Sequence, residues 1–312
     1  MKIAFLFPGQ GSQIIGMGKY FYDNFHEAKI VFEEVDNALN QKLSNIMFNG
    51  PEEDLTSTEN TQPALMTCSI AMLKVIEKLS GKNIKDLCQF VAGHSLGEFT
   101  ALTATNALDL NSAAKLLKLR GQAMQEAVPR GKGAMFALLG ADFEIAKDIA
   151  KEASTKGEIC EVANDNSQQQ QVLSGTVPGI DLALKIAQEK GFKAIKLKVS
   201  APFHCSLMKP AQEKLAQALE AIEINEPSVP IIANVNAEIE QKAQIKENLI
   251  KQTTNTVLWC NSMQKLKQLG VTNFLEIGPG SVYANLCKRI DKECSAIALN
   301  NIENINNFIE NI

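Results

Sequence analysis

The stretch Phe90-Val91-Ala92-Gly93-His94-Ser95-Leu96-Gly97-Glu98-Phe99 decides the fold of this chain. The apolar run at 87–92 predicts a buried strand, and the spacing from Leu96 onward predicts a helix. Between them, Gly93-x-Ser95-x-Gly97 is a G-x-S-x-G pattern, which places a serine on a tight, strained turn with its hydroxyl exposed. The glycines suit a turn where passing backbone leaves no room for a Cβ. The free N–H groups and the positive dipole end of the helix would face an oxyanion formed at the serine.

The five-residue pattern by itself is a weak signal, because glycine and serine are common. The strand before it and the helix after it strengthen the prediction of an exposed, reactive serine. The alternative is a glycine-rich turn in which Ser95 only caps the following helix. The rest of the chain has to decide between these two interpretations.

Composition restricts the class of protein. The chain has 312 residues, 45% of them hydrophobic and 21% charged, which predicts a soluble globular protein with one large domain or two. The net charge of −4 gives no reason to expect nucleic acid or a membrane as a partner. The apolar run at the N-terminus is too short for a signal peptide, and no stretch approaches a membrane span. Seven scattered cysteines without a C-x-x-C predict a reducing cytoplasm and no metal or other cofactor.

The order of the expected elements predicts an α/β protein with two domains. Strands expected at 2–7, 87–92, 231–235, 273–277 and 295–299 alternate with helices, which favours a parallel sheet covered on both faces. Pro129-Arg130-Gly131 ends a helix, and a strand–helix–strand–strand–helix–strand order follows over 134–199, as in a ferredoxin-like unit. We expect a large domain at 1–130 and 199–312, interrupted by a small domain at 131–198. The glutamine run Gln168–Gln171 is interpreted as a solvated turn leading into a strand.

A nucleophilic serine needs a base, and the chain has only three histidines. His26 is expected on a surface helix, and His94 is adjacent to Ser95, where neighbouring side chains on a sharp turn point apart. His204 remains, in a proline-containing loop after a strand; the alternative is a loop histidine bonded to the backbone. No convincing carboxylate emerges to orient it, since Asp165 and Asp291 are weak candidates. A backbone carbonyl or an amide side chain would serve instead.

Arg120 stands out in a chain that has 28 lysines and three arginines among its 31 basic residues. It falls on the apolar face of a helix expected at 112–128, three and four residues after Leu117 and Leu116. A buried guanidinium requires an anionic partner. Two interpretations stay open: an internal salt bridge, or a grip on the carboxylate of a substrate through two parallel hydrogen bonds.

With Ser95, Arg120 and His204 in place, the whole chain resembles the malonyl-CoA:acyl carrier protein transacylases of dissociated fatty acid synthesis. The resemblance is carried by several motifs in a fixed order: Phe5-Leu6-Phe7-Pro8-Gly9-Gln10-Gly11-Ser12-Gln13, Gln62-Pro63-Ala64, Gly93-His94-Ser95-Leu96-Gly97-Glu98, Arg120-Gly121, Ala163-Asn164-Asp165-Asn166-Ser167, Phe203-His204-Cys205, Gln252 and Glu276-Ile277-Gly278-Pro279-Gly280. Thr256 departs from this pattern, because family members commonly carry proline there, and so does Phe136, which replaces a smaller residue.

The resemblance implies an α/β-hydrolase-like large domain with a parallel sheet, interrupted by the ferredoxin-like small domain. It implies a ping-pong transfer of malonyl from malonyl-CoA through Ser95 to the phosphopantetheine thiol of acyl carrier protein. His204 would be the base, with its ring oriented by the backbone carbonyl of Gln252. The oxyanion hole would be the backbone N–H groups of Gln10 and Leu96, and Arg120 would bind the malonyl carboxylate.

Further residues follow from the same resemblance. Gln62 and Asn164 are expected to line the site, and Phe203 resembles the malonyl-type loop, in which a bulky ring crowds an α-methyl group. A monomer is expected. The competing predictions are a serine thioesterase or esterase that uses the same serine and histidine, and a binding module without chemistry.

Carrier proteins are typically acidic, so a local basic rim is expected to receive one despite the net charge of −4. The candidate side chains are Lys193, Lys196, Lys198, Lys209, Lys288 and Arg289. The alternative is that these residues are ordinary solvated charges.

Overall fold

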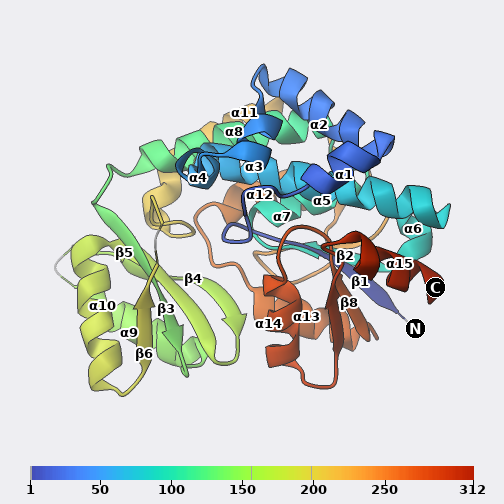
Figure 1. Ribbon diagram of the computed structural model, residues 1–312. Helices are drawn as coiled ribbons and strands as arrows, with labels where there is room; N and C mark the ends of the chain where they lie inside the picture. Colours follow the sequence, from blue (N-terminus) through green and yellow to red (C-terminus); the bar gives the residue numbers. More distant parts are fainter. Residues whose placement is uncertain (1, 156, 198) are drawn as a thin grey trace.

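Two separate sheets organise the chain in the computed structural model, which describes residues 2–155, 157–197 and 199–312 (Figure 1). The first is a five-stranded parallel sheet with the order β7-β2-β1-β8-β9. Its strands are β1 (Ile3–Phe7), β2 (Phe90–Gly93), β7 (Ile231–Ile232), β8 (Asn273–Glu276) and β9 (Ser295–Ala298). The predicted parallel sheet is confirmed. The strand expected at 231–235 is shorter than predicted, since Asn234 turns its side chain toward β2.

Both faces of the parallel sheet are buried, as its apolar strands predicted. Phe5 and Phe7 point into one core and Ala4 and Leu6 into another, because successive side chains of a strand alternate. The first core is built with α2, α5, α7 and α8, and the second with α13 and α14. Figure 1 shows the first group as a layer above the sheet and the second group below it. No helix in these described ranges combines the length and the apolar character that a membrane crossing needs.

The helices of this part of the chain have the following bounds: α1 (Lys19–Asn24), α2 (His26–Leu39), α3 (Leu43–Asn49), α4 (Glu52–Thr56), α5 (Thr58–Ser80), α6 (Ile84–Leu87), α7 (Leu96–Ala104), α8 (Leu110–Ala127), α11 (Lys209–Glu220), α12 (Ile245–Gln252), α13 (Trp259–Gln268), α14 (Val282–Ile290) and α15 (Ile302–Glu310). Short 3₁₀ turns, η1 (Ser206–Met208) and η2 (Lys242–Gln244), precede α11 and α12.

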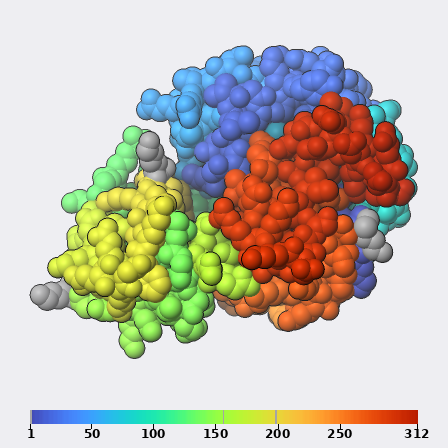
Figure 2. Space-filling view, turned by 60° about the horizontal axis from the view of Figure 1, so that its bottom comes forward, coloured from blue at the N-terminus to red at the C-terminus, as the bar shows by residue number. Residues whose placement is uncertain are grey.

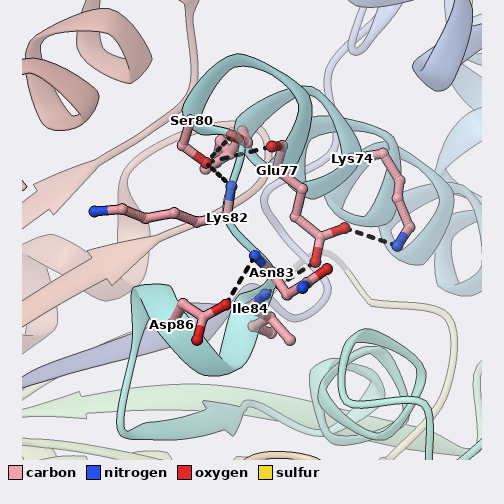
Figure 3. Close-up of polar contacts among 8 residues, drawn as sticks. Lys74, Glu77, Ser80, Lys82, Asn83, Ile84 and Asp86 are labelled. Carbon is pink, nitrogen blue, oxygen red and sulfur yellow. Dashed lines mark hydrogen bonds and ion pairs between the residues drawn. The ribbon is translucent and has the colours of Figure 1, made fainter.

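Polar side chains make several contacts at the turn between α5 and α6, shortly before β2 (Figure 3). Glu77 accepts from the backbone N–H of Ile84 at 3.0 Å and from Lys74 Nζ at 2.8 Å. Asn83 caps α6 in a capping box with Asp86. The backbone N–H groups of Asn83, Ile84 and Asp86 therefore have partners at the start of this four-residue helix.

The second sheet is antiparallel and has the order β4-β5-β3-β6. Its elements are β3 (Gly133–Leu139), α9 (Phe143–Ala153), β4 (Cys160–Ser167), β5 (Gln170–Thr176), α10 (Val177–Glu189) and β6 (Lys193–Lys196). Phe136 and Leu138 pack with α9 and α10, whereas Met135 on the opposite face packs toward α8 and Phe203. Figures 1 and 2 show this sheet and its two helices lying beside the rest of the molecule.

Two expectations for this region need correction. The last strand ends at Lys196, where the sequence predicted a strand over 192–199, and residue 198 lies outside the described residues. The glutamine run leads into β5 at Gln170, as predicted, but it is not solvated throughout, because Gln171 is fully buried. The Gln171 side chain turns back and donates from Nε2 to the Ser167 carbonyl at 2.7 Å, so it closes the hairpin from inside.

Backbone hydrogen bonds join β4 of the antiparallel sheet to the segment around Val257, just before α13. Asp165 N–H donates to the Val257 carbonyl at 3.0 Å, and Val257 N–H donates to the Ala163 carbonyl at 2.9 Å. Thr256 Oγ1 donates to the Val162 carbonyl at 2.6 Å, a bond that a proline at this position lacks. The segment before α13 therefore lies alongside β4 and pairs with it in parallel at Val257.

Candidate active site

The turn between β2 and α7 carries Ser95 in a strained conformation, with φ 55° and ψ −110°. A Cβ on Gly93 would lie 1.8 Å from the Gly97 carbonyl oxygen, and one on Gly97 would lie 2.3 Å from the Phe7 carbonyl oxygen. Both glycines are therefore required by close backbone approach, as the sequence predicted. Because Leu96 is the first residue of α7, its N–H has no acceptor within the helix and faces the turn.

Asn234, in the turn that follows β7, holds the Ser95 turn in place, and the sequence analysis missed it. Its Oδ1 accepts from the Ser95 backbone N–H at 2.7 Å, and its Nδ2 donates to the Gly93 carbonyl at 2.7 Å. One amide side chain thus satisfies a donor and an acceptor on either side of the nucleophile candidate. A single buried asparagine carries no signal in the sequence that would have pointed to this contact.

Ser95 and His204 come together although 109 residues separate them in the chain: Ser95 Oγ lies 2.8 Å from His204 Nε2. His204 Nδ1 lies 2.8 Å from the backbone carbonyl of Gln252. A carbonyl can only accept, so Nδ1 carries the proton and Nε2 presents its lone pair to the serine hydroxyl. His204 has φ 56°, so this residue, like Ser95, lies in the left-handed region.

The surroundings keep His204 neutral. Its pKa is lowered to about 3, mainly by burial and next by the positive charge of Arg120. The bond to the Gln252 carbonyl acts the other way and raises the pKa. A neutral imidazole whose free nitrogen points at a serine hydroxyl has the form that a general base needs.

Arg120 is buried, with 1% of its surface exposed, and its guanidinium reaches the same serine. Nη2 donates to Ser95 Oγ at 3.1 Å and to Gln252 Oε1 at 2.8 Å, and Nη1 donates to Gln62 Oε1 at 2.7 Å. Burial lowers the pKa of Arg120 to about 10, so it stays charged near neutral pH. Among the described residues no carboxylate forms an ion pair with Arg120, so the internal salt bridge considered from the sequence is not observed there.

The other two histidines do not reach Ser95. His94 Nε2 lies 3.1 Å from Asn166 Oδ1, and its ring packs against Trp259 and Tyr283 at centroid distances of 5.5 and 5.0 Å. Burial lowers the pKa of His94 to about 4. His26 is exposed at the first position of α2. Both placements agree with the sequence expectations.

Neither weak carboxylate candidate orients His204. Asp165 lies in β4 with its backbone N–H on Val257, and burial raises its pKa to about 6. Asp291 pairs with Lys267 beyond the end of α14. The Gln252 carbonyl takes the orienting position in the geometry, at the C-terminal residue of α12.

A cavity of about 340 Å³ opens in front of Ser95. Eight of the nine predicted site residues line it: Gln10, Gln62, Ser95, Leu96, Arg120, Asn164, Phe203 and His204. Gln252 lies behind this wall and contacts the cavity through Arg120 and His204. Gln10 and Leu96 both face the cavity beside Ser95, which suits backbone donors to an oxyanion.

The opposite side of the cavity is largely apolar. Met124, Met135, Leu197, Val199 and Phe203 contribute to it. Asn164 is the polar exception from β4; it is buried, and its Nδ2 has no partner within the described part of the chain. A ligand in this cavity therefore meets charge and hydrogen-bond donors on one side and hydrocarbon on the other.

The predicted basic rim is distributed more widely than a single patch. Lys196 pairs with Asp181 at 3.2 Å, and Arg289 donates to Gln170 Oε1 at 2.8 Å. Lys288 and Arg289 line a groove with the hairpin of β4 and β5. Lys198 lies outside the described residues. The docking role of these side chains stays a prediction.

Comparison with known proteins agrees with this geometry. Residues 4–305 match the family model described as the acyl transferase domain. The chain is 47% identical over 313 residues to a malonyl CoA-acyl carrier protein transacylase of Bacillus subtilis (strain 168), covering 100% of this chain and 97% of that one. It is 40% identical to the protein of the same name from Escherichia coli (strain K12), covering 96% of each.

Solved structures give the same answer. An acyl-carrier-protein-S-malonyltransferase from Bartonella henselae superposes with a TM-score of 0.96 at 43% identity, covering 99% of each chain. A malonyl-transacylase solved in complex with its type II PKS acyl-carrier protein has a TM-score of 0.96 at 39% identity, covering 100% of each chain.

The match of residues 4–305 to the acyl transferase domain shows the class of protein to which the chain belongs. Within this class, the chain is 37–47% identical to many relatives that share one name, over essentially their full lengths. The chain belongs to the malonyl CoA-acyl carrier protein transacylase family.

Proposed function

We propose that this protein transfers a malonyl group from malonyl-CoA to the phosphopantetheine thiol of acyl carrier protein and so supplies fatty acid synthesis. The observation that carries the proposal is one chain of contacts: the Gln252 carbonyl to His204, His204 to Ser95 Oγ, and Arg120 to the same Oγ. Family membership supports the substrate and the acceptor. The enzyme is an acyl-carrier-protein S-malonyltransferase, and no cofactor takes part in the steps below.

In the first half-reaction, His204 Nε2 takes the Ser95 proton as Oγ attacks the thioester carbonyl of malonyl-CoA. The Oγ–carbon bond forms, and the carbonyl oxygen becomes an oxyanion held by the backbone N–H groups of Gln10 and Leu96. The carbon–sulfur bond then breaks, and the protonated His204 returns its proton to the CoA thiolate. The Ser95 malonyl ester remains.

The second half-reaction repeats these steps with a different thiol. His204 takes the proton of the phosphopantetheine thiol as sulfur attacks the ester, and returns it to Ser95 Oγ when the ester breaks. In this proposal the Gln252 carbonyl orients the His204 ring through its bond with Nδ1–H. A carbonyl in this position adds no negative charge to the site.

Arg120 selects the acyl group in this proposal. Three of its five N–H groups are engaged by protein, and Nε has no partner among the described residues. A malonyl carboxylate beside it removes the cost of a buried unpaired cation, whereas a neutral acyl group leaves that cost in place. Gln62 holds the guanidinium, Asn164 lines the thioester side, and the Phe203 ring excludes an α-methyl group.

We propose further that the parallel sheet and its helices form an α/β-hydrolase-like domain at 1–130 and 199–312. The segment 131–198 is then a ferredoxin-like domain, which its strand–helix–strand–strand–helix–strand order and the sheet order β4-β5-β3-β6 support. A monomer in a reducing cytoplasm is proposed with it; all seven cysteines are free thiols. Light scattering on a size-exclusion column tests the monomer.

The deciding experiment is intact-protein mass after brief mixing with malonyl-CoA, run beside acetyl-CoA and beside the Ser95→Ala variant. We expect a malonyl increment on the wild type alone, removed when acyl carrier protein with its phosphopantetheine arm is added. An increment that disappears in buffer at the same rate would identify a thioesterase or esterase. No increment under any condition would leave a binding module and overturn the proposal.

A further inference from the structure

Two buried glutamates lie beneath the Ser95 turn and take no part in the reaction above. Glu98 is on α7, three residues after the nucleophile, and has 1% of its surface exposed. Glu240 follows β7 and has 7% exposed. Carboxyl groups are rarely buried in this way without a specific partner, so the pair requires a physical account.

The Oε2 atom of each carboxyl group accepts a hydrogen bond from an N–H donor. Glu98 Oε2 accepts from Gln252 Nε2 at 2.6 Å and from the Asn234 backbone N–H at 3.3 Å. Glu240 Oε2 accepts from Asn248 Nδ2 at 2.9 Å. The remaining Oε1 atom of each glutamate has no N–H or hydroxyl donor among the described residues.

One proton shared between the two carboxyl groups would give a partner to both Oε1 atoms, which otherwise have none in the ranges that the structure describes. Glu240 raises the pKa of Glu98 as a neighbouring charge and as a hydrogen-bond partner, in addition to the larger effect of burial. Two carboxylates cannot hydrogen-bond unless one of them keeps its proton. The pair therefore shares one proton and carries one negative charge.

Gln252 connects this pair to the substrate side of the site. Its Nε2 donates to Glu98 and, at 2.9 Å, to the Ser95 carbonyl, while its Oε1 accepts from Arg120 Nη2 at 2.8 Å. A flipped amide would place an NH₂ group against the guanidinium and a carbonyl against Glu98 Oε2. Both new contacts would be repulsive, so the Glu98 acceptor, together with the Ser95 carbonyl, fixes the orientation of the amide.

We propose that the Glu98–Glu240 pair is a positioning device that locks the Gln252 amide so that its oxygen holds Arg120 ready for the malonyl carboxylate. The inference rests on the proposed function, because it assigns the pair a role through Arg120 and not through Ser95 chemistry. The single negative charge of the pair also offsets the buried Arg120 cation, which no carboxylate contacts in the described residues.

The test measures kcat/KM for acylation of Ser95 by malonyl-CoA and by acetyl-CoA in the full chain. In Glu98→Ala, the Gln252 amide keeps the Ser95 carbonyl but loses its acceptor on Glu98, which loosens the charge-assisted bond from Arg120 to Gln252 Oε1. We expect the malonyl value to fall about tenfold more than the acetyl value. In Glu98→Gln, the side-chain oxygen accepts from Gln252 and the NH₂ donates to Glu240. This variant mimics the protonated glutamate and should restore the wild-type preference.

Glu276→Ala is the matched control. Glu276 is a fully buried carboxyl group that accepts from the Tyr283 and Ala284 backbone N–H groups at 3.0 and 2.8 Å, and no hydrogen bond links it to Gln252. Its loss should lower stability while the malonyl-to-acetyl ratio stays unchanged. Gln252→Met is the second variant, used if Glu98→Ala does not fold; it keeps the backbone carbonyl on His204 and should reproduce the loss of malonyl preference.

Four results separate the outcomes. Equal losses for malonyl and acetyl in Glu98→Ala, or a Glu98→Gln variant as impaired as Glu98→Ala, would overturn the positioning role. A wild-type malonyl preference that survives Gln252→Met would overturn it too. A wild type that forms no malonyl-enzyme at all would instead refute the proposed function, before any variant is considered.

Discussion

The two sides of the cavity differ in chemistry and in origin. The side built on the parallel sheet carries Ser95, Arg120 and the Leu96 N–H, and hydrogen bonds hold each side chain from behind. The side toward the antiparallel sheet is formed largely by hydrocarbon, including Met135 and Leu197. One side has a fixed geometry set by buried polar partners, whereas the other is shaped by packing.

This difference indicates a division of labour. On the polar side, the Asn234 side chain holds the Ser95 N–H and the Gly93 carbonyl, and the Gln252 carbonyl holds the His204 ring. Such buried partners keep reacting groups in a fixed geometry. The apolar side excludes water and limits the shape of the acyl group. Substitutions on the first side should change the chemistry or the choice of charge, and those on the second should change the tolerated size.

The largest effect is expected from removing the base on the polar side. In His204→Ala, malonyl-enzyme formation should fall about 10³-fold or more, because nothing removes the Ser95 proton. Stopped reactions followed by intact mass measure it. His204→Asn is the matched control, since asparagine tolerates the positive φ of this position; a loss in the alanine variant alone would trace the effect to the backbone and not to the base.

The second largest effect tests the charge on the same side. In Arg120→Ala, kcat/KM for malonyl-CoA should fall about 10²-fold, while acetyl-CoA is affected much less, because only malonyl has a carboxylate to bind. Arg120→Lys keeps the charge without the planar fork and should lie between the two. An unchanged ratio of malonyl to acetyl transfer would refute the role of Arg120 in selection.

The third effect concerns stability. The pKa of His204 is about 3 in the folded chain and 6.5 when exposed, so between these values only the unfolded chain binds a proton. Stability from this group is present above pH 6.5 and is lost as the pH falls. At pH 5 the wild type should have lost about 2 kcal/mol relative to His204→Asn. Urea unfolding at pH 7 and 5 measures the difference; His94 is common to both proteins and cancels.

The smallest effect is expected on the apolar side. Phe203→Ser removes a ring that is 9% exposed and lines the cavity, so methylmalonyl-CoA should gain severalfold relative to malonyl-CoA. Competition between the two thioesters, read by mass, measures the ratio. No gain for methylmalonyl in a folded variant would show that another residue excludes the α-methyl group.

The sequence predicted most of the polar side, because its residues stand at motifs with a physical reason: glycines at a close approach, a serine at a strand end and an arginine on an apolar stripe. Asn234, Glu98 and Glu240 were not assigned a role. Their function depends on contacts across more than 130 residues, such as that between Asn234 and Gly93, and no local pattern reports these. Glu98 lies in the stretch at 90–99, but its hydrogen-bond partners are far away in the sequence.

The apolar side was harder to predict for a different reason. Met135 and Leu197 belong to ordinary strand patterns, and only the packing of the second sheet decides which of their faces meets the cavity. The glutamine run shows the same limit, because Gln171 is buried by a bond to Ser167 within the hairpin that composition does not reveal. The spacing of apolar residues predicted where the helices and strands lie in the chain. Which face of each element is buried depends on contacts between elements.

The backbone at Ser95 has a consequence for the history of the chain. Its φ of 55° lies in a region of backbone conformation that serine rarely adopts and glycine adopts freely. A copy of the gene released from selection for transfer would gain about 1 kcal/mol of stability by replacing Ser95 with glycine. Decay of activity in such a lineage would be favoured by folding, so a glycine in the G-x-S-x-G turn of a relative would mark a protein kept for something other than catalysis.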